Sequence, residues 1–328
     1  MIPQISSTPS NTPSNTATIT PTSTSCPLFI TPTHTQTNTP TIAVTQTMTP
    51  TMTFTPTRTA TPTMTPTPSA ISYLLDVYGS AKVAYSLRRL RASQTNAITI
   101  RRSNDNATQD IGFVGQDLDT AAITSFVGSN DAFITKWWDQ SGNGNDLTRV
   151  TNSEQPRIVS GGTIQLARNS KPAIFFDGSN DYFTLNTGIT TVNTLTEAWV
   201  IDRTSGSTFS IGLASSSALN PFYSFWFSDN SIYFRPGSVA GVFLGAGSTA
   251  NDYLLFSVFS GNSWSISRNN FPLGSQSYTG SGLSLNAFGR RSSNYNQSLQ
   301  QEYVLWESSQ ASNQTGIQNN INNYYSVY

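Results

Sequence analysis

The sequence predicts an all-β sandwich preceded by an extended arm, because the composition changes abruptly near residue 70. Residues 1–70 are rich in Thr and Pro and contain no Asp, no Glu and a single Arg, Arg58. The rest of the chain holds all 17 carboxylates and all six Trp. Its short apolar runs are bounded by Gly, Asn, Ser and Asp, which is typical of a sandwich or barrel of many short strands. Because sandwiches of this length commonly form one domain, we expect an arm over residues 1–70 and a sandwich over residues 71–328.

The arm carries a strict two-residue repeat. From Thr31 to Thr67 every odd-numbered position is Thr except Ala43. Period two is the side-chain period of an extended chain, and frequent Pro favours polyproline-like or edge-strand geometry. One interpretation is a flexible, glycosylated linker of mucin type. The strict alternation favours another: an ordered arm that pairs with copies of itself, in a trimer, or lies along a neighbouring protein.

Short apolar runs in the second part of the chain are expected to form the strands. They are residues 97–101, 132–138, 173–176, 197–201, 222–227, 231–234, 254–259, 263–267 and 302–306. Fully apolar runs predict inner strands, and alternating runs predict strands with one face in water.

Two helices are expected beside these strands. The first covers residues 119–126, with Asp119 or Thr120 as its N-cap. The second closes the chain after Ser312, a plausible cap. Its apolar side chains fall on one helical face, and they are Ile317, Ile321, Tyr324 and Tyr328.

Composition excludes several classes of function. The net charge is zero, whereas nucleic-acid binding needs a basic face. No apolar run approaches a membrane span of about 20 residues, and the chain start has no visible secretory signal. The only His, His34, and the only Cys, Cys26, lie in the arm, which excludes catalytic triads and zinc sites from the sandwich. Catalysis there would need carboxylates or Tyr, and a metal, if present, would be calcium.

Several motifs between residues 84 and 182 carry a resemblance to known domains. They are residues 84–91, 100–106, 109–113, 155–158 and 171–182, together with Trp-Asp-Gln-Ser-Gly-Asn-Gly-Asn-Asp over residues 138–146. With the motifs over residues 84–91, 100–106, 109–113 and 138–146, the chain resembles a domain of bacteriophage and giant-virus structural proteins that often follows Thr-Pro repeats. Residues 155–182 also look like the first hairpin of concanavalin A-like or laminin-G-like jelly rolls. The resemblance implies a jelly-roll sandwich with a short C-terminal helix.

The element over residues 138–146 is also similar to one in the catalytic domain of α-L-arabinofuranosidase B. That family consists of retaining glycosidases with a Glu nucleophile and an Asp acid. Only four Glu occur in the chain, and Glu197, at the start of a predicted inner strand, is the best candidate nucleophile. Its local sequence differs from the family's, so we do not expect catalytic activity.

Two polar turns and one Trp are the candidate site residues. Asp139 and Gln140 fix a turn through the backbone in one interpretation; in the other, the loop faces a sugar or calcium. The loop residues that would bind sugar are Trp138, Asp139, Gln140, Asn143 and Asn145. Trp137 and Trp138 are adjacent and point to opposite faces of their strand, so one is expected in the core.

The hairpin loop over residues 177–181 is the second candidate. It is expected to be a turn first and a calcium site second, with Asp177 and Asp181 as ligands. No other cofactor is expected.

These observations predict a virion-surface protein, namely a fibre, spike or capsid-decoration protein, and not an enzyme. Its arm would bind capsid or tail proteins, and its sandwich would bind carbohydrate or a host surface without entering a membrane. Two alternatives are a carboxylate-dependent glycosidase and a capsid cement protein that binds no ligand.

Overall fold

The computed structural model describes residues 72–190, 194–203, 210–214, 225–228, 231–234, 242–246, 252–277, 284–291 and 293–328. These residues all belong to one unit of the chain, Thr67–Tyr328. The predictions about the arm over residues 1–70, including its self-pairing and trimer, lie outside the described residues.

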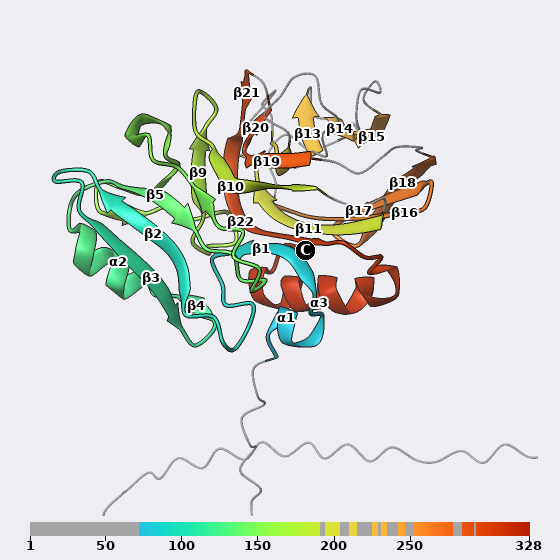
Figure 1. Ribbon diagram of the computed structural model, residues 1–328, viewed down its shortest axis with the longest axis horizontal. Helices are drawn as coiled ribbons and strands as arrows, with labels where there is room; N and C mark the ends of the chain where they lie inside the picture. Colours follow the sequence, from blue (N-terminus) through green and yellow to red (C-terminus); the bar gives the residue numbers. More distant parts are fainter. Residues whose placement is uncertain are drawn as a thin grey trace, which may run out of the picture. The chain divides into compact units, whose positions relative to one another are not determined.

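The described strands form a sandwich, as the sequence predicts (Figure 1). Its first sheet is built around the long strand β22, which pairs with β11 along one side and with β1 and β9 along the other. Beyond β11 follow β16, β17 and β18, all antiparallel. The strands of this sheet are β1 (Ala81–Ser86), β9 (Ile174–Asp177), β11 (Thr194–Asp202), β16 (Asp252–Ser260), β17 (Ser263–Arg268), β18 (Phe271–Ser277) and β22 (Gln297–Trp306).

The second sheet runs in the order β3, β2, β5, β6, β10, β19, β12, again with antiparallel neighbours. Its strands are β2 (Asn96–Arg102), β3 (Thr108–Val114), β5 (Ala132–Trp137), β6 (Leu147–Thr148), β10 (Phe183–Thr190), β12 (Leu213–Ala214) and β19 (Ser284–Phe288). Strand β7 (Arg157–Ser160) pairs with both β5 and β9, so the two sheets are continuous at that edge.

Shorter elements surround these sheets. They are β4 (Asp117–Leu118), β8 (Thr163–Ile164), the three-stranded sheet of β13 (Phe225–Ser228), β14 (Ser231–Phe234) and β15 (Val242–Ala246), the pair β20 (Arg290–Arg291) and β21 (Asn294–Tyr295), and the 3-10 turns η1 (Asn152–Glu154) and η2 (Ala311–Asn313).

Alternation along the strands divides the buried side chains into two cores. On β11, Trp199 and Ile201 belong to the core between the two sheets, whereas Ala198 and Val200 belong to a core on the outer face of the first sheet. Helix α1 (Leu74–Val77) and helix α3 (Gln314–Tyr325) cover that outer face (Figure 1). Successive residues of one strand therefore lie in different environments.

Helix α2 (Thr120–Val127) begins as predicted. The Asp119 side chain accepts a hydrogen bond from the backbone N–H of Ala122 at 2.9 Å, which satisfies one of the free donors of the first turn.

The predicted features of the last helix are partly wrong. Ser312 lies in the 3-10 turn η2, and Asn313, which precedes α3, makes no side-chain cap bond. The helix ends at Tyr325 because Ser326 adopts a left-handed φ of 51°. Tyr328 therefore falls outside the helix and is 45% exposed, while Tyr325 is buried in the outer core in its place.

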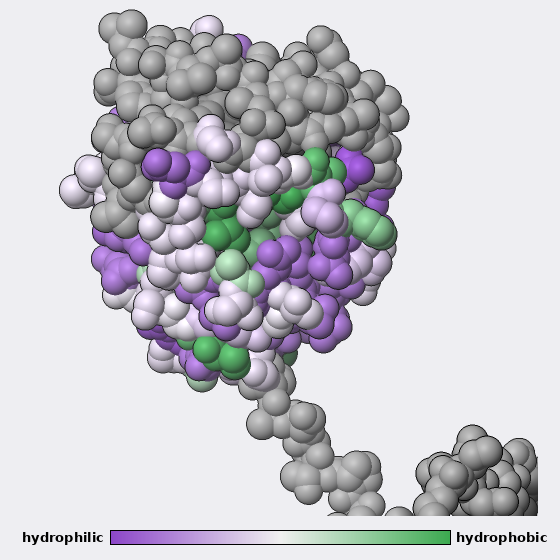
Figure 2. Space-filling view, turned by 90° about the vertical axis from the view of Figure 1, so that its right-hand side faces the viewer, coloured by the Kyte–Doolittle hydropathy of each residue, from purple (hydrophilic) through white to green (hydrophobic). Residues whose placement is uncertain are grey.

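No described helix is long and apolar enough to cross a membrane. Figure 2 shows one face of the domain, on which hydrophobic residues form small, separated patches among hydrophilic ones.

Candidate active site

Asp139 is the centre of the turn that follows β5. Its side chain is nearly buried and accepts four hydrogen bonds, from the backbone N–H of Ala84 (2.9 Å), the N–H and hydroxyl of Ser141 (2.9 and 2.7 Å) and the N–H of Asn145 (3.0 Å). Four bonds use the full accepting capacity of a carboxylate. Asp139 therefore holds this loop against β1.

Gln140 has an equivalent role toward the segment after β1. Its Oε1 accepts from the N–H of Leu90 at 2.8 Å, and its Nε2 donates to the carbonyls of Ser86 and Arg88 at 2.9 and 3.0 Å. Gln140 is fully buried. The structure thus places Asp139 and Gln140 beneath the loop surface.

Asn143 and Asn145, from the same loop, line a pocket of about 640 Å³, which we call the asparagine pocket. Both side-chain amides donate to the backbone carbonyl of Lys82, at 3.0 and 3.2 Å. The other lining residues are Ser80, Ala81, Lys82, Thr187, Gly188, Ile189, Thr190 and Glu307. Lys82 and Glu307 are 3.0 Å apart and form an ion pair. The asparagine pocket therefore offers polar side chains but a single, already paired carboxylate.

Trp137 and Trp138 point to opposite faces, as predicted. Trp137 is fully buried in the core, and Trp138 is half-buried. The indole N–H of Trp138 donates to the Thr99 hydroxyl at 3.1 Å, and the ammonium of Lys136 lies 4.0 Å from its ring centroid. One face of the Trp138 ring is therefore covered by a cation.

Asp177 and Asp181 lie together in a pocket of about 250 Å³, which we call the aspartate pocket. Its lining residues are Phe133, Asn152, Ser153, Gln155, Arg157, Phe175, Asp177 and Asp181. Asp177 closes the hairpin turn by accepting from the N–H groups of Ser179 and Asn180 at 2.8 and 3.3 Å. The Asp181 carboxylate accepts from the N–H of Asp177 at 2.9 Å. These bonds are those of the predicted turn.

Burial, and then the charge of Asp177, raise the pKa of Asp181 from its ordinary 3.8 to about 7. Asp181 is 6% exposed, whereas Asp177 is exposed. Two carboxylates in one pocket, one of them buried with a raised pKa, are suited to acid–base chemistry. Among the described residues, no group of three or more His, Cys, Asp or Glu is placed to hold a metal ion, so calcium at Asp177 and Asp181 stays a prediction.

The Glu residues do not form such a pair. On β11, Glu197 alternates with Ala198 and so faces the core between the sheets, where the hydroxyl of Tyr303 donates to it. On β22, Glu302 faces the outer core, where it pairs with Arg88. Because one sheet separates Glu197 from Glu302, they cannot act on one substrate.

The other two Glu residues are each paired with a cation. Glu154 binds Arg149, and Glu307 binds Lys82. Two further acidic residues, Asp229 and Asp252, have side chains outside the described ones.

A third pocket, of about 460 Å³, was not predicted from the sequence. We call it the cationic pocket, and its lining residues are Thr99, Arg101, Asn106, Thr108, Thr135, Lys136, Thr148, Arg149, Val150, Asn152 and Gln155. It shares Asn152 and Gln155 with the aspartate pocket. The sequence signal was the pair Arg101–Arg102 on a strand that alternates between two faces, but the partners of Arg101 come from distant segments.

Part of the chain is similar in sequence to a known protein family. Residues 76–216 match the family model described as alpha-L-arabinofuranosidase B, catalytic. No curated protein sequence matches the chain. This part of the chain is thus distantly similar to a glycoside hydrolase catalytic domain.

Solved structures of arabinofuranosidases share the fold. One is an arabinofuranosidase complexed with arabinofuranosyl-alpha-1,2-xylobiose, with a TM-score of 0.61 and 17% identity. Two others are a GH54 α-L-arabinofuranosidase mutant soaked with 4-nitrophenyl α-L-arabinofuranoside and a GH54 enzyme soaked with a cyclic sulfate inhibitor, with TM-scores of 0.59 and 0.58 and 18% identity each. In each case 74% of this chain is covered, and the chain spans 62% of the length of the other protein.

These comparisons contradict the predicted function. The chain was expected to be a virion-surface fibre, spike or capsid-decoration protein without enzymatic activity. The match of residues 76–216 to a catalytic-domain family points instead to a glycoside hydrolase, the alternative that the sequence also suggested. The prediction was wrong because it required a recognisable Glu-centred catalytic pair, whereas a distant relative can keep the fold with different local sequence around its carboxylates.

Proposed function

We propose that the sandwich is a glycoside hydrolase domain that acts on α-L-arabinofuranosides. The observation that carries this proposal is the match of residues 76–216 to the arabinofuranosidase B catalytic domain. The segment includes every residue that lines the aspartate pocket.

We assign Asp181 as the general acid and Asp177 as the second carboxylate of the site. A pKa of about 7 keeps Asp181 protonated in weakly acidic solution, which a proton donor to the glycosidic oxygen requires. Asp177 is exposed at the pocket and stays available to the sugar. In net terms, the bond from the anomeric carbon to the leaving oxygen breaks and that oxygen takes the Asp181 proton. Water adds its hydroxyl to the anomeric carbon, and the remaining proton of that water restores the Asp181 acid.

The pocket also offers apolar surface to a sugar ring. Phe133 and Phe175 line it together with the two carboxylates. Arg157 lies over the Phe175 ring at 5.4 Å, and its charge partly offsets the rise in the pKa of Asp181. Aromatic surface beside a few polar groups is a common arrangement in small-molecule sites.

The test uses two substrates with different leaving groups. 4-Nitrophenyl α-L-arabinofuranoside has a leaving group that hardly needs protonation, whereas an arabino-oligosaccharide needs it. Asp181→Asn is expected to lower kcat on the oligosaccharide by about 10²-fold or more and to affect the aryl substrate much less. Asp177→Asn is expected to lower kcat on both substrates.

Asp110→Asn is the matched control, because Asp110 is exposed and lies outside the three pockets. If the natural protein hydrolyses neither substrate, the proposed function is wrong. If hydrolysis survives in Asp181→Asn and Asp177→Asn but is lost in Asp229→Asn or Asp252→Asn, the function stands and the assigned pair is wrong.

A further inference from the structure

The cationic pocket adjoins the proposed catalytic carboxylates and has a different charge. None of its lining residues is acidic, and three of them are cations: Arg101, Lys136 and Arg149. Because Asn152 and Gln155 line both pockets, the two pockets are immediate neighbours.

Two of the three cations are already paired with carboxylates. Lys136 lies 3.3 Å from Asp146, and Arg149 contacts Glu154. These pairs leave little net charge at their positions.

Arg101 differs, because its partners are all neutral. Its guanidinium donates to Oε1 of Gln155 (2.7 Å), Oδ1 of Asn106 (2.9 Å) and the carbonyl of Asn152 (3.4 Å), and it lies 5.0 Å from the Phe133 ring centroid. Arg101 is only 7% exposed, and desolvation lowers its pKa. A nearly buried cation without an anion is costly to fold, so the pocket keeps a positive charge that is not needed for stability.

The geometry of Arg101 suits a carboxylate. A guanidinium has five N–H donors, and the hydrogen bonds of Arg101 use three of them, one from each nitrogen. One donor on each terminal nitrogen remains, which matches the two oxygens of a carboxylate. The threonine hydroxyls in the lining, such as those of Thr99 and Thr135, are of the kind that bind sugar hydroxyls.

We propose that the cationic pocket binds the carboxylate of a uronic acid residue, so that the domain acts on an acidic, uronic-acid-containing polysaccharide. This proposal rests on the proposed function, because it takes the ligand to be a polysaccharide. To the proposed function it adds a substrate class, acidic polysaccharides, and assigns Arg101 as the residue that selects the acidic sugar.

Calorimetric titration of the full chain with an oligogalacturonide and with its methyl ester tests the proposal. The acid form is expected to bind at least about tenfold more tightly than the ester, because a hydrogen-bonded charge pair is lost on esterification. Arg101→Gln is expected to abolish that difference, and Arg101→Lys to keep only part of it because the two-pronged donor geometry is lost. Acetate and phosphate, as simple anions, are expected to compete weakly.

Arg102→Gln is the matched control, since Arg102 is the next residue on β2, pairs with Asp105 and does not line the pocket. If Arg101→Gln does not fold, Arg101→Lys, which keeps the charge, replaces it and is expected to reduce the preference for the acid form severalfold. Equal binding of acid and ester, binding of neither, or an unchanged preference in the Arg101 variant that folds overturns the proposal. Hydrolysis of the neutral aryl arabinofuranoside, measured in parallel, reports on the proposed function separately.

Discussion

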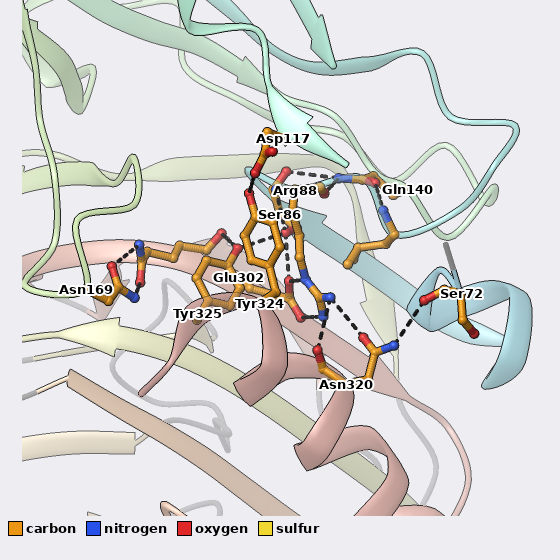
Figure 3. A network of polar contacts seen from close by, with 12 residues as sticks. Ser72, Ser86, Arg88, Asp117, Gln140, Asn169, Glu302, Asn320, Tyr324 and Tyr325 are labelled. Atoms are coloured by element: carbon orange, nitrogen blue, oxygen red, sulfur yellow. Dashed lines mark hydrogen bonds and ion pairs between the residues drawn. The ribbon is translucent and has the colours of Figure 1, made fainter. Parts of the chain in front are cut away.

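Arg88 and Glu302 form a two-pronged ion pair from which water is fully excluded. Nε of Arg88 lies 2.7 Å from one Glu302 oxygen and its terminal nitrogen lies 3.0 Å from the other, and both side chains are 0% exposed. Arg88 also donates to the side chain of Asn320 at 2.9 Å, and Glu302 accepts from the Ser86 hydroxyl at 2.8 Å (Figure 3). The pair therefore joins the segment after β1 to β22 and α3.

Removing one partner of this pair is expected to leave a buried, unbalanced charge. Glu302→Gln should lower the free energy of unfolding by about 3–5 kcal/mol, as measured by urea denaturation. The double variant Arg88→Met/Glu302→Leu leaves no charge behind and should be more stable than either single variant. A Glu302→Gln variant as stable as the natural protein would show that the pair contributes nothing.

The raised pKa of Asp181 predicts that the stability of the domain depends on pH. Its folded pKa of about 7 lies above its ordinary 3.8, so between these pH values the folded protein holds a proton that the unfolded chain has released. The contribution of Asp181 is therefore fully present below pH 4 and is lost as the pH rises through about 7. The melting temperature of the natural protein should fall relative to that of Asp181→Asn between pH 4 and 8. Parallel pH curves for the two proteins would contradict the raised pKa.

Asp139 is expected to stabilise the folded domain through the four hydrogen bonds that its carboxylate accepts. Asparagine has a single accepting oxygen, so Asp139→Asn is expected to destabilise the domain by about 2–3 kcal/mol. Asp110→Asn is a suitable control because Asp110 is exposed and accepts from the Thr99 hydroxyl alone. Chemical denaturation of both variants checks this expectation, which fails if they are equally stable.

The sandwich is expected to need neither zinc nor a disulfide, because its sequence contains no His and no Cys. A zinc-selective chelator should leave the melting temperature unchanged. The calcium prediction for Asp177 and Asp181 is checked in the same assay. A clear drop in melting temperature with a calcium chelator, reversed by added calcium, would support a calcium site over a simple turn.

The arm and the sandwich are expected to be energetically separate, because the composition changes near residue 70. A fragment that begins at Ser69 should therefore melt cooperatively at the temperature of the full chain. A fragment that is insoluble or lacks a cooperative transition would show that residues 1–68 contribute to folding.

Secondary-structure elements with local signals could be predicted from the amino-acid sequence. Alternating apolar residues predicted strands such as β2, β5 and β17, because the side-chain period depends on neighbours within a few positions. For the same reason the cap of α2 was narrowed to Asp119 or Thr120, and the structure selects Asp119. The opposite directions of Trp137 and Trp138 follow from the same period. The hairpin turn after β9, which contains Asp177 and Asp181, was also predicted from the sequence.

Contacts between segments far apart in the sequence determine which polar residues share a site. Glu197 and Glu302 both lie in runs that the sequence predicts to be strands. The pairing of β11 with β22 places their side chains on opposite faces of one sheet. Arg101 is nearly buried, and the Gln155 side chain that accepts its hydrogen bond lies more than fifty positions away in the sequence. The burial that raises the pKa of Asp181 is likewise set in the folded domain, where Phe133 and Arg157 from distant segments line the same pocket. Charge and burial are set by contacts between distant segments, and a local pattern carries no information about those contacts.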